Sequence, residues 1–189
     1  YHHSRSSQLI RSSLLLLMLL ATVAAAQKPV AVAPPLPSAA ATSIRFEDAT
    51  GSSGIDFTHS FGSRQLGSLL EGTGGGCVWF DYNNDGRPDI FFTNGAAGPG
   101  MKKDAPKYWN RLFRNDGGND GGWKFTDVTA EAGLAGKGYA MGAAAADFDN
   151  DGNVALFVAI VGGSILYRNL GNGKFQDVTA AAGLPVDLW

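Results

Sequence analysis

The strongest constraint on the fold of this 189-residue chain is an internal repeat. One unit occupies about residues 72–134 and a second about residues 138–184. The first ends in "KFTDVTAEAGL" and the second in "KFQDVTAAAGL". A third, partial copy in residues 44–71 opens with the related "RFEDATGSSGIDF". Agreement of this length predicts that each unit is a copy of one structural module.

Each unit is predicted to consist of short β-strands and turns. The stretches "CVWF", "IFFT", "RLFRN", "ALFVAIV" and "ILYRN" are apolar and rich in β-formers. "NLGNGKF" predicts a hairpin connection, and "TAEAGL" and "TAAAGL" allow only one helical turn. A unit of roughly 50 residues with four strands has the size of a propeller blade. The sequence therefore predicts an all-β fold, a partial β-propeller.

The first unit carries an oxygen-rich loop, "DYNNDGRPD", at residues 81–89. Positions 1, 3, 5 and 9 of this loop are Asp81, Asn83, Asp85 and Asp89, and the backbone carbonyl of Arg87 at position 7 is a further candidate ligand. A glycine at position 6 permits a sharp bend. Because Ca²⁺ takes six to eight oxygen ligands from carboxylates, amides and carbonyls, the pattern predicts a calcium site.

The second unit repeats this loop as "DFDNDGNVA" at residues 147–155. It offers Asp147, Asp149, Asp151 and the carbonyl of Asn153, but Ala155 stands where the first loop has its fourth acidic residue. We therefore expect the second site to bind calcium more weakly than the first.

Three alternatives to calcium binding compete for these loops. Asn and Asp are common in solvated turns, although recurrence at the same place in two units argues against that interpretation. An EF-hand requires a bidentate Glu at position 12, where this chain has Phe92 and Val158. Mg²⁺ usually binds through only one or two carboxylates, so the denser cluster suits Ca²⁺ better.

The combined motifs "DYNNDGRPDIF", "LFRNDGG", "GAAAADFDNDG" and "LYRNLGNGKFQDVTAAAGL" resemble the FG-GAP/VCBS repeats of integrin-α-like propellers. The chain is most similar to bacterial proteins related to cartilage acidic protein, which often end in an ASPIC/UnbV domain. The resemblance covers about residues 44–184 and implies a secreted β-propeller with calcium-binding hairpin loops. On this basis seven side chains match the metal-ligand motif: Asp81, Asn83, Asp85, Asp89, Asp147, Asp149 and Asp151.

The N-terminal residues predict export, and the C-terminal residues predict that the chain is a fragment. Residues 1–26 combine Arg5 and Arg11 with an apolar run and the small residues of a cleavage site, which is typical of a signal peptide. The apolar run is shorter than the roughly 20 residues of a membrane span. Residues 27–43 are a Pro/Ala-rich linker, and residues 185–189 are interpreted as a truncated end beyond which further blades are missing. We expect a secreted, periplasmic or cell-surface location.

The sequence favours a binding or adhesion scaffold for a protein or glycan over an enzyme. The net charge of −2, without a basic run, argues against nucleic acid. His59 is the sole histidine outside the expected signal and more often a turn or surface residue than a catalyst. The alternative function is a propeller-based polysaccharide lyase or hydrolase, which requires a defined catalytic constellation.

Three further expectations concern single features. The insertion at residues 95–111 is either a solvated loop or an amphipathic ligand surface formed by Lys102, Lys103, Lys107, Tyr108 and Trp109. Cys77, the one cysteine, is expected to be a buried, inert thiol. Arg114 and Arg168 recur in both units and are each expected to pair with an acidic residue of the same unit.

Overall fold

The computed structural model describes residues 45–61, 72–97, 101–118 and 122–185. The chain divides into two compact units, Tyr1–Phe46 and Glu47–Trp189, and every described strand and helix belongs to the second. The predicted signal, the predicted linker and most of the predicted truncated end lie outside the described residues.

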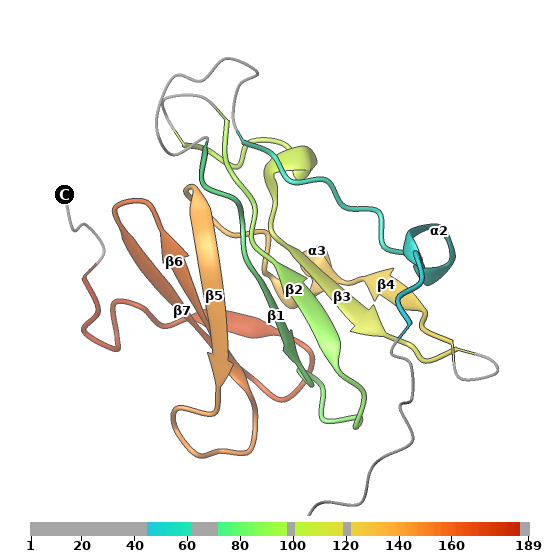
Figure 1. Cartoon of the computed structure of the whole chain (residues 1–189). Helices are drawn as coiled ribbons and strands as arrows, with labels where there is room; N and C mark the ends of the chain where they lie inside the picture. The colour runs from blue at the N-terminus through green and yellow to red at the C-terminus, as the bar shows by residue number, and fades with distance from the viewer. Residues whose placement is uncertain (1–44, 62–71, 98–100, 119–121, 186–189) are drawn as a thin grey trace, which may run out of the picture. The chain divides into compact units, whose positions relative to one another are not determined.

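The second unit contains two four-stranded antiparallel sheets, one for each repeat (Figure 1). The first sheet is β1 (Cys77–Phe80), β2 (Asp89–Phe92), β3 (Arg111–Asn115) and β4 (Phe125–Asp127). The second is β5 (Ala140–Ala146), β6 (Ala155–Ile160), β7 (Gly163–Asn169) and β8 (Phe175–Asp177). In both sheets the spatial order follows the chain, so the predicted all-β fold of four short strands per unit is confirmed.

The two sheets are stacked, and side-chain alternation gives each a distinct pair of faces. In the first sheet Val78, Phe80, Phe91 and Leu112 form one side, which we call the Phe91 face. Its opposite side, the Trp79 face, carries Trp79, Ile90, Phe92, Phe113 and Phe125. In the second sheet Leu156, Val158, Ile165, Tyr167 and Phe175 form the Tyr167 face, and Phe157 and Leu166 lie on the other, the Phe157 face.

The main core lies where the Phe91 face meets the Tyr167 face. Phe91, Leu112, Leu156, Val158 and Ile165 are fully buried there. The first strands of the two sheets, β1 and β5, lie side by side (Figure 1). Burial of an apolar side chain of this size stabilises a fold by roughly 1.5–3 kcal/mol, so this contact holds the two repeats together.

A buried asparagine also links the two sheets through the backbone. Asn169, at the end of β7, donates from Nδ2 to the carbonyl of Tyr82 in the first repeat at 2.7 Å and to that of Val154 at 3.1 Å. In the first sheet Asn115 donates in the same way to the carbonyl of Pro88 at 3.0 Å. The shared bond explains why both third strands end in asparagine.

The Phe-x-Asp-x-Thr motif forms the same turn in all three copies. In each, the aspartate accepts the backbone N–H of the threonine two residues later: Asp48 from Thr50, Asp127 from Thr129 and Asp177 from Thr179. The single helical turns α2 (Thr50–Ser53) and α3 (Thr129–Ala132) follow, and Gly54 and Gly133 end them at positive φ. The expectation of one helical turn in the first complete unit is confirmed, and the partial copy adopts the same turn.

Two expectations about single residues are wrong. Cys77 is exposed, because alternation along β1 places it on the Trp79 face, which no second sheet covers among the described residues. Lys103 does not belong to a ligand surface in the insertion. Its Nζ turns inward and donates to the carbonyls of Asn94, Gly95 and Tyr108 at 2.7–2.8 Å, which fastens the insertion to the end of β2.

Candidate metal centre

The two acidic loops connect the first and second strands of their sheets and lie at the same edge of the molecule (Figure 1). They touch directly. Nδ2 of Asn84 in the first loop donates to the carbonyl of Gly152 and to Oδ1 of Asn153 in the second, both at 3.2 Å. The side chain of Asn84 therefore joins the two loops.

Both loops have one backbone conformation. Asn84 and Asn150 at position 4 have φ of 59° and 56°, and Gly86 and Gly152 at position 6 have φ of 81° and 85°. Asparagine and glycine are the residues that adopt this left-handed region most readily. The predicted bend at the glycine is confirmed. The second bend, at the asparagine, is a feature that the repeated Asn-Asp-Gly could have indicated.

The first residue of each loop closes the loop onto its own backbone. In the first loop, Oδ1 of Asp81 accepts the N–H of Asp85 at 3.1 Å and Oδ2 accepts that of Gly86 at 2.7 Å. Asp147 makes the same two bonds to Asp151 and Gly152, at 3.1 and 3.0 Å. Each carboxylate oxygen has a further lone pair, so these bonds leave room for a cation.

An acceptor oxygen in the first loop lacks a partner. Oδ1 of Asn83, at position 3, is buried and makes no hydrogen bond, although Nδ2 of the same side chain donates to Oδ2 of Asp85 at 2.7 Å. Buried polar atoms are nearly always satisfied, and an unmet one costs about 1–3 kcal/mol. A hard cation at the centre of the loop would satisfy this oxygen.

The second loop brings three carboxylates together. Asp147, Asp149 and Asp151 are exposed, and one oxygen from each lies within 4.8 Å of the others. Among the described carboxylates the first loop forms no such trio, because its third position is an asparagine and Asp89 turns toward the backbone. The greater affinity expected for the first loop therefore stays a prediction.

Asp89, at position 9, has a structural role that the sequence did not indicate. It is fully buried, and its two oxygens accept the backbone N–H groups of Tyr82 at 3.0 Å and Asn115 at 2.7 Å. It thus ties the start of the loop to the end of β3. Burial raises the pKa of Asp89 to about 6, and the two N–H donors oppose the shift. Its remaining lone pairs could still reach a cation.

Arginine guanidinium groups form ion pairs with carboxylates of the two loops and partly neutralise their charge. Nε of Arg168 lies 2.7 Å from Asp149 and its NH2 atom 3.1 Å from Asp151, while Arg87 lies 2.6 Å from Asp85. Arg114 pairs with Asp116 at 2.6 Å. The expected pairing of Arg114 and Arg168 within their own units is confirmed. Because exposed ion pairs contribute little, a divalent cation could displace these guanidinium groups at small cost.

The difference at position 9 gives a first prediction. Ala155 is 2% exposed, and its Cβ occupies the place from which Asp89 reaches two backbone N–H groups. We expect Ala155→Asp to tighten calcium binding by the second loop, because it restores an acidic residue at the loop's far end. Calorimetric titration measures the change, and Ala155→Asn is the uncharged control. An unchanged or weaker second site would show that position 9 does not serve the ion.

His59, the one histidine among the described residues, lies against aromatic side chains. The His59 ring packs edge-on against Phe57 at 4.7 Å and Phe92 at 6.2 Å between centroids, and its Nδ1 is buried without a partner. Burial lowers the pKa of His59, so the neutral ring is favoured. A hydrogen bond with the backbone of Thr93 opposes this shift in part, so the ring has both aromatic and polar contacts.

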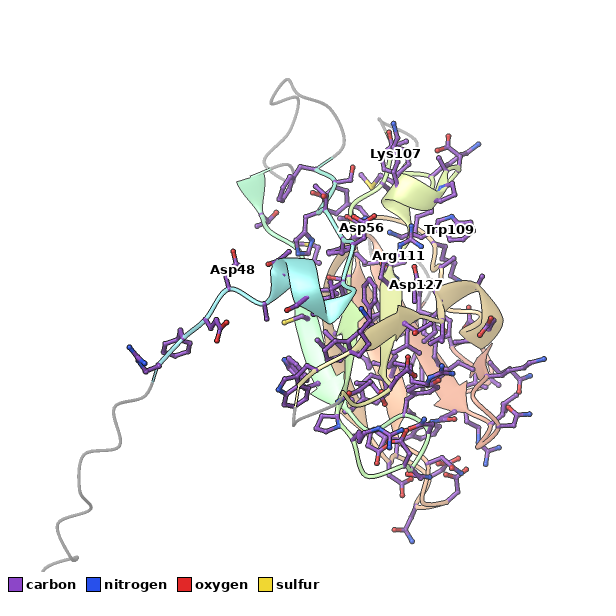
Figure 2. The ribbon with its side chains drawn as sticks, turned by 90° about the vertical axis from the view of Figure 1, so that its right-hand side faces the viewer. Asp48, Asp56, Lys107, Trp109, Arg111 and Asp127 are labelled. Atoms are coloured by element: carbon purple, nitrogen blue, oxygen red, sulfur yellow. The ribbon has the colours of Figure 1, made fainter. Side chains whose placement is uncertain are left out.

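The insertion presents a small cationic and aromatic surface beside β3 (Figure 2). Arg111 lies over the Trp109 ring at 5.8 Å and forms an ion pair with Asp127 at 2.7 Å. Lys107 lies over Tyr108 at 4.8 Å. Three of the five residues predicted to form this surface, Lys107, Tyr108 and Trp109, take part in these contacts.

Residues 81–158 match the family model described as FG-GAP-like repeat. The match includes both acidic loops, the strands β2, β3 and β4 of the first sheet, and β5 and the start of β6 in the second. Residues 81–158 are thus similar to an FG-GAP-like repeat, and the two described sheets form an all-β, propeller-like arrangement. No curated protein matches the chain. Within the described residues, the helices are too short and too polar for any of them to cross a membrane.

Proposed function

We propose that this chain is an exported, calcium-binding repeat module that acts as a binding or adhesion scaffold. The observation that carries the calcium part is the unmet Oδ1 of Asn83 at the third position of the first loop. It is supported by the three converging carboxylates in the matching loop of the second repeat.

The donor set fits Ca²⁺ on chemical grounds. Each loop offers oxygens alone, and a mixture of carboxylate, amide and carbonyl oxygens at six or more positions is what Ca²⁺ prefers. The side chains that would hold the ion in the first loop are Asp81, Asn83, Asp85 and Asp89, with the carbonyl of Arg87. In the second they are Asp147, Asp149 and Asp151, with the carbonyl of Asn153.

Calcium in these loops would act on the fold rather than on a reaction. Three carboxylates lie close together in the second loop, and their mutual repulsion opposes the native loop shape. A divalent ion removes that repulsion. Because Asn84 joins the two loops, both ions would stiffen the same edge of the stacked sheets.

The proposal predicts a calcium-dependent melting temperature. Extracellular calcium modules bind with Kd of about 10⁻⁴–10⁻³ M, so calcium at ten times Kd would add about 1.4 kcal/mol per site. We expect calcium to raise the melting temperature of the chain and EGTA to lower it. Asp85→Ala should remove most of the stabilisation that calcium in the first loop provides.

The control is magnesium at the same concentration, which should have a smaller effect because Mg²⁺ retains several of its waters. A melting curve that responds to neither calcium nor EGTA would refute the calcium part of the proposal.

A scaffold role is proposed in preference to an enzyme because the described residues provide no nucleophile or base in a defined constellation. His59 packs among aromatic rings, Arg168 pairs with a loop carboxylate, and Arg114 pairs with Asp116 outside the loops. Calcium-independent cleavage of a glycan or ester that His59→Ala abolishes would favour the enzyme.

A protein or glycan ligand could contact the surface of Lys107, Tyr108 and Trp109, and loss of ligand binding in Trp109→Ala would test that contact.

A further inference from the structure

A pocket of about 300 Å³ lies at the end of the first sheet that carries the insertion. The acidic loop of this sheet comes directly before β2 and the insertion follows β2, so the pocket and the loop lie at opposite ends of that strand. Three segments of the chain line the pocket: residues 56–58, Asn94 just after β2, and the stretch that contributes Lys107 and Arg111. A concave surface with a few polar groups is the usual form of a ligand site.

A buried asparagine holds these three segments together. Asn94 is 1% exposed, and its Oδ1 accepts the backbone N–H of Ser60 at 2.7 Å. Its Nδ2 donates to the backbone carbonyls of Lys107 at 3.0 Å and Trp109 at 3.1 Å. The walls of the pocket are therefore fixed by internal hydrogen bonds, so a ligand would not have to order the backbone when it binds.

Two side chains of opposite charge face this pocket without an ion-pair partner. Lys107 and Asp56 both line it and are exposed. Among the described residues neither forms an ion pair, with the other or with a third residue. The ammonium group of Lys107 lies over the Tyr108 ring at 4.8 Å. One cationic and one anionic group are thus available to a ligand in the same small space.

A second cationic group in the pocket is held in place. Arg111 donates from one terminal nitrogen to Asp127 at 2.7 Å and from the other to the carbonyl of Pro106 at 2.9 Å. Figure 2 shows Arg111 with Asp56 on one side and Trp109 on the other. Because its position is set by these contacts, the guanidinium group adds positive charge to the pocket wall at a fixed point.

This combination of groups selects a ligand with one anionic group among several hydroxyl groups. A carboxylate would be attracted by Lys107 and Arg111. Asp56 would repel a second anionic group, but an ionised carboxylate accepts hydrogen bonds from hydroxyl groups readily. Thr58, on the same wall, offers a hydroxyl group of its own. A sugar ring that bears a single carboxylate carries this set of groups, and a densely charged anion does not.

We propose that this pocket binds a uronic acid residue of an acidic polysaccharide. The carboxylate of the sugar lies toward Lys107 and Arg111, and its ring hydroxyl groups donate to Asp56. The inference rests on the proposed role of the chain as a binding scaffold, and it narrows the ligand to an acidic saccharide.

The test is a titration of fluorescein-labelled oligosaccharides with the full chain, followed by anisotropy in EGTA at about 0.15 M salt. The probes are oligomers of galacturonate, glucuronate and mannuronate. The methyl ester of the galacturonate oligomer keeps the hydroxyl groups but loses the charge, and a polyglutamate peptide has carboxylates without hydroxyl groups. We expect saturable binding of at least one uronate and at least tenfold weaker binding of both controls.

Three variants at exposed positions locate the contact and should leave the melting temperature unchanged. Lys107→Gln should weaken uronate binding about tenfold, because a charge-assisted hydrogen bond is lost, and Lys107→Arg should retain most of it. Lys102→Gln is the matched control, since Lys102 belongs to the same insertion but does not line the pocket.

Asp56→Asn separates a saccharide site from a surface that merely attracts anions. If Asp56 accepts hydroxyl groups of the sugar, its replacement should weaken uronate binding about fivefold, because a charged acceptor is lost. On a surface that only attracts anions, removal of a negative charge would tighten binding instead. Tighter binding by Asp56→Asn would therefore overturn the inference.

Three other results would also overturn it: no binding of any of the three uronates, equal binding of the methyl ester, and polyglutamate binding as tight as that of the best uronate. The last result would identify an acidic protein as the occupant. A neutral glycan or a protein that Trp109→Ala releases, without uronate binding, would refute this inference and leave the scaffold role standing. Because EGTA is present throughout, the outcome does not depend on the calcium proposal.

Discussion

Replacement of Phe91 by alanine should lower the free energy of unfolding by about 3–5 kcal/mol, because it leaves a cavity in a closely packed core. Phe91 is fully buried and lies on the face of β2 that meets the second sheet. The loss should appear in urea denaturation as a lower midpoint with an unchanged slope.

The matched control is Phe157→Ala. Phe157 occupies the same position in the second repeat but is 39% exposed, because no further sheet covers the Phe157 face among the described residues. The substitution should cost about 1 kcal/mol or less, since little apolar area leaves a packed environment. Equal losses for Phe91→Ala and Phe157→Ala would contradict the assignment of the two faces.

Asp89→Ala should have the second large effect, a loss of about 2–5 kcal/mol in EGTA. The substitution leaves the backbone N–H groups of Tyr82 and Asn115 buried without acceptors, and each unmet group costs about 1–3 kcal/mol. Asp89→Asn should lose less, because the amide oxygen still accepts one of the two bonds. Urea denaturation in EGTA isolates this role from any contribution of an ion.

The control for Asp89 is Asp149→Ala, which removes an exposed carboxylate paired with Arg168. An exposed ion pair contributes about 0–1 kcal/mol, so the expected change is small. If both variants lost the same free energy of unfolding, the two hydrogen bonds that Asp89 accepts would not stabilise the fold as we expect.

The repeat made most of the fold predictable from the sequence. The strands, the hairpin at residues 170–174 and the single-turn helix after β4 follow from alternation, glycine placement and the recurrence of both in two units. The bends at Gly86 and Gly152 were also predictable, because few residues other than glycine adopt such φ values.

Features that depend on which sheet face is covered could not be predicted. The apolar surroundings of Cys77 in the sequence indicated burial, but no sheet in the described part of the chain packs on its face of β1, and the residue is exposed. Lys103 was placed on a surface by its charge, yet three backbone carbonyls turn its ammonium group inward. Asp89 was assigned to an ion from its spacing alone, and its bonds to two distant backbone N–H groups depend on tertiary structure.

The central claim, that the paired acidic loops bind calcium, is tested most directly by calorimetric titration of calcium into the metal-free chain. We predict two binding events, of which Asp85→Ala removes one and Asp151→Ala the other, while Asp116→Ala, a carboxylate outside both loops, retains both. Kd values of about 10⁻⁴–10⁻³ M would place the sites among extracellular calcium modules. Absence of binding at a calcium concentration ten times the upper end of this Kd range would contradict the account. Calcium binding that survives replacement of both Asp85 and Asp151 would contradict it as well.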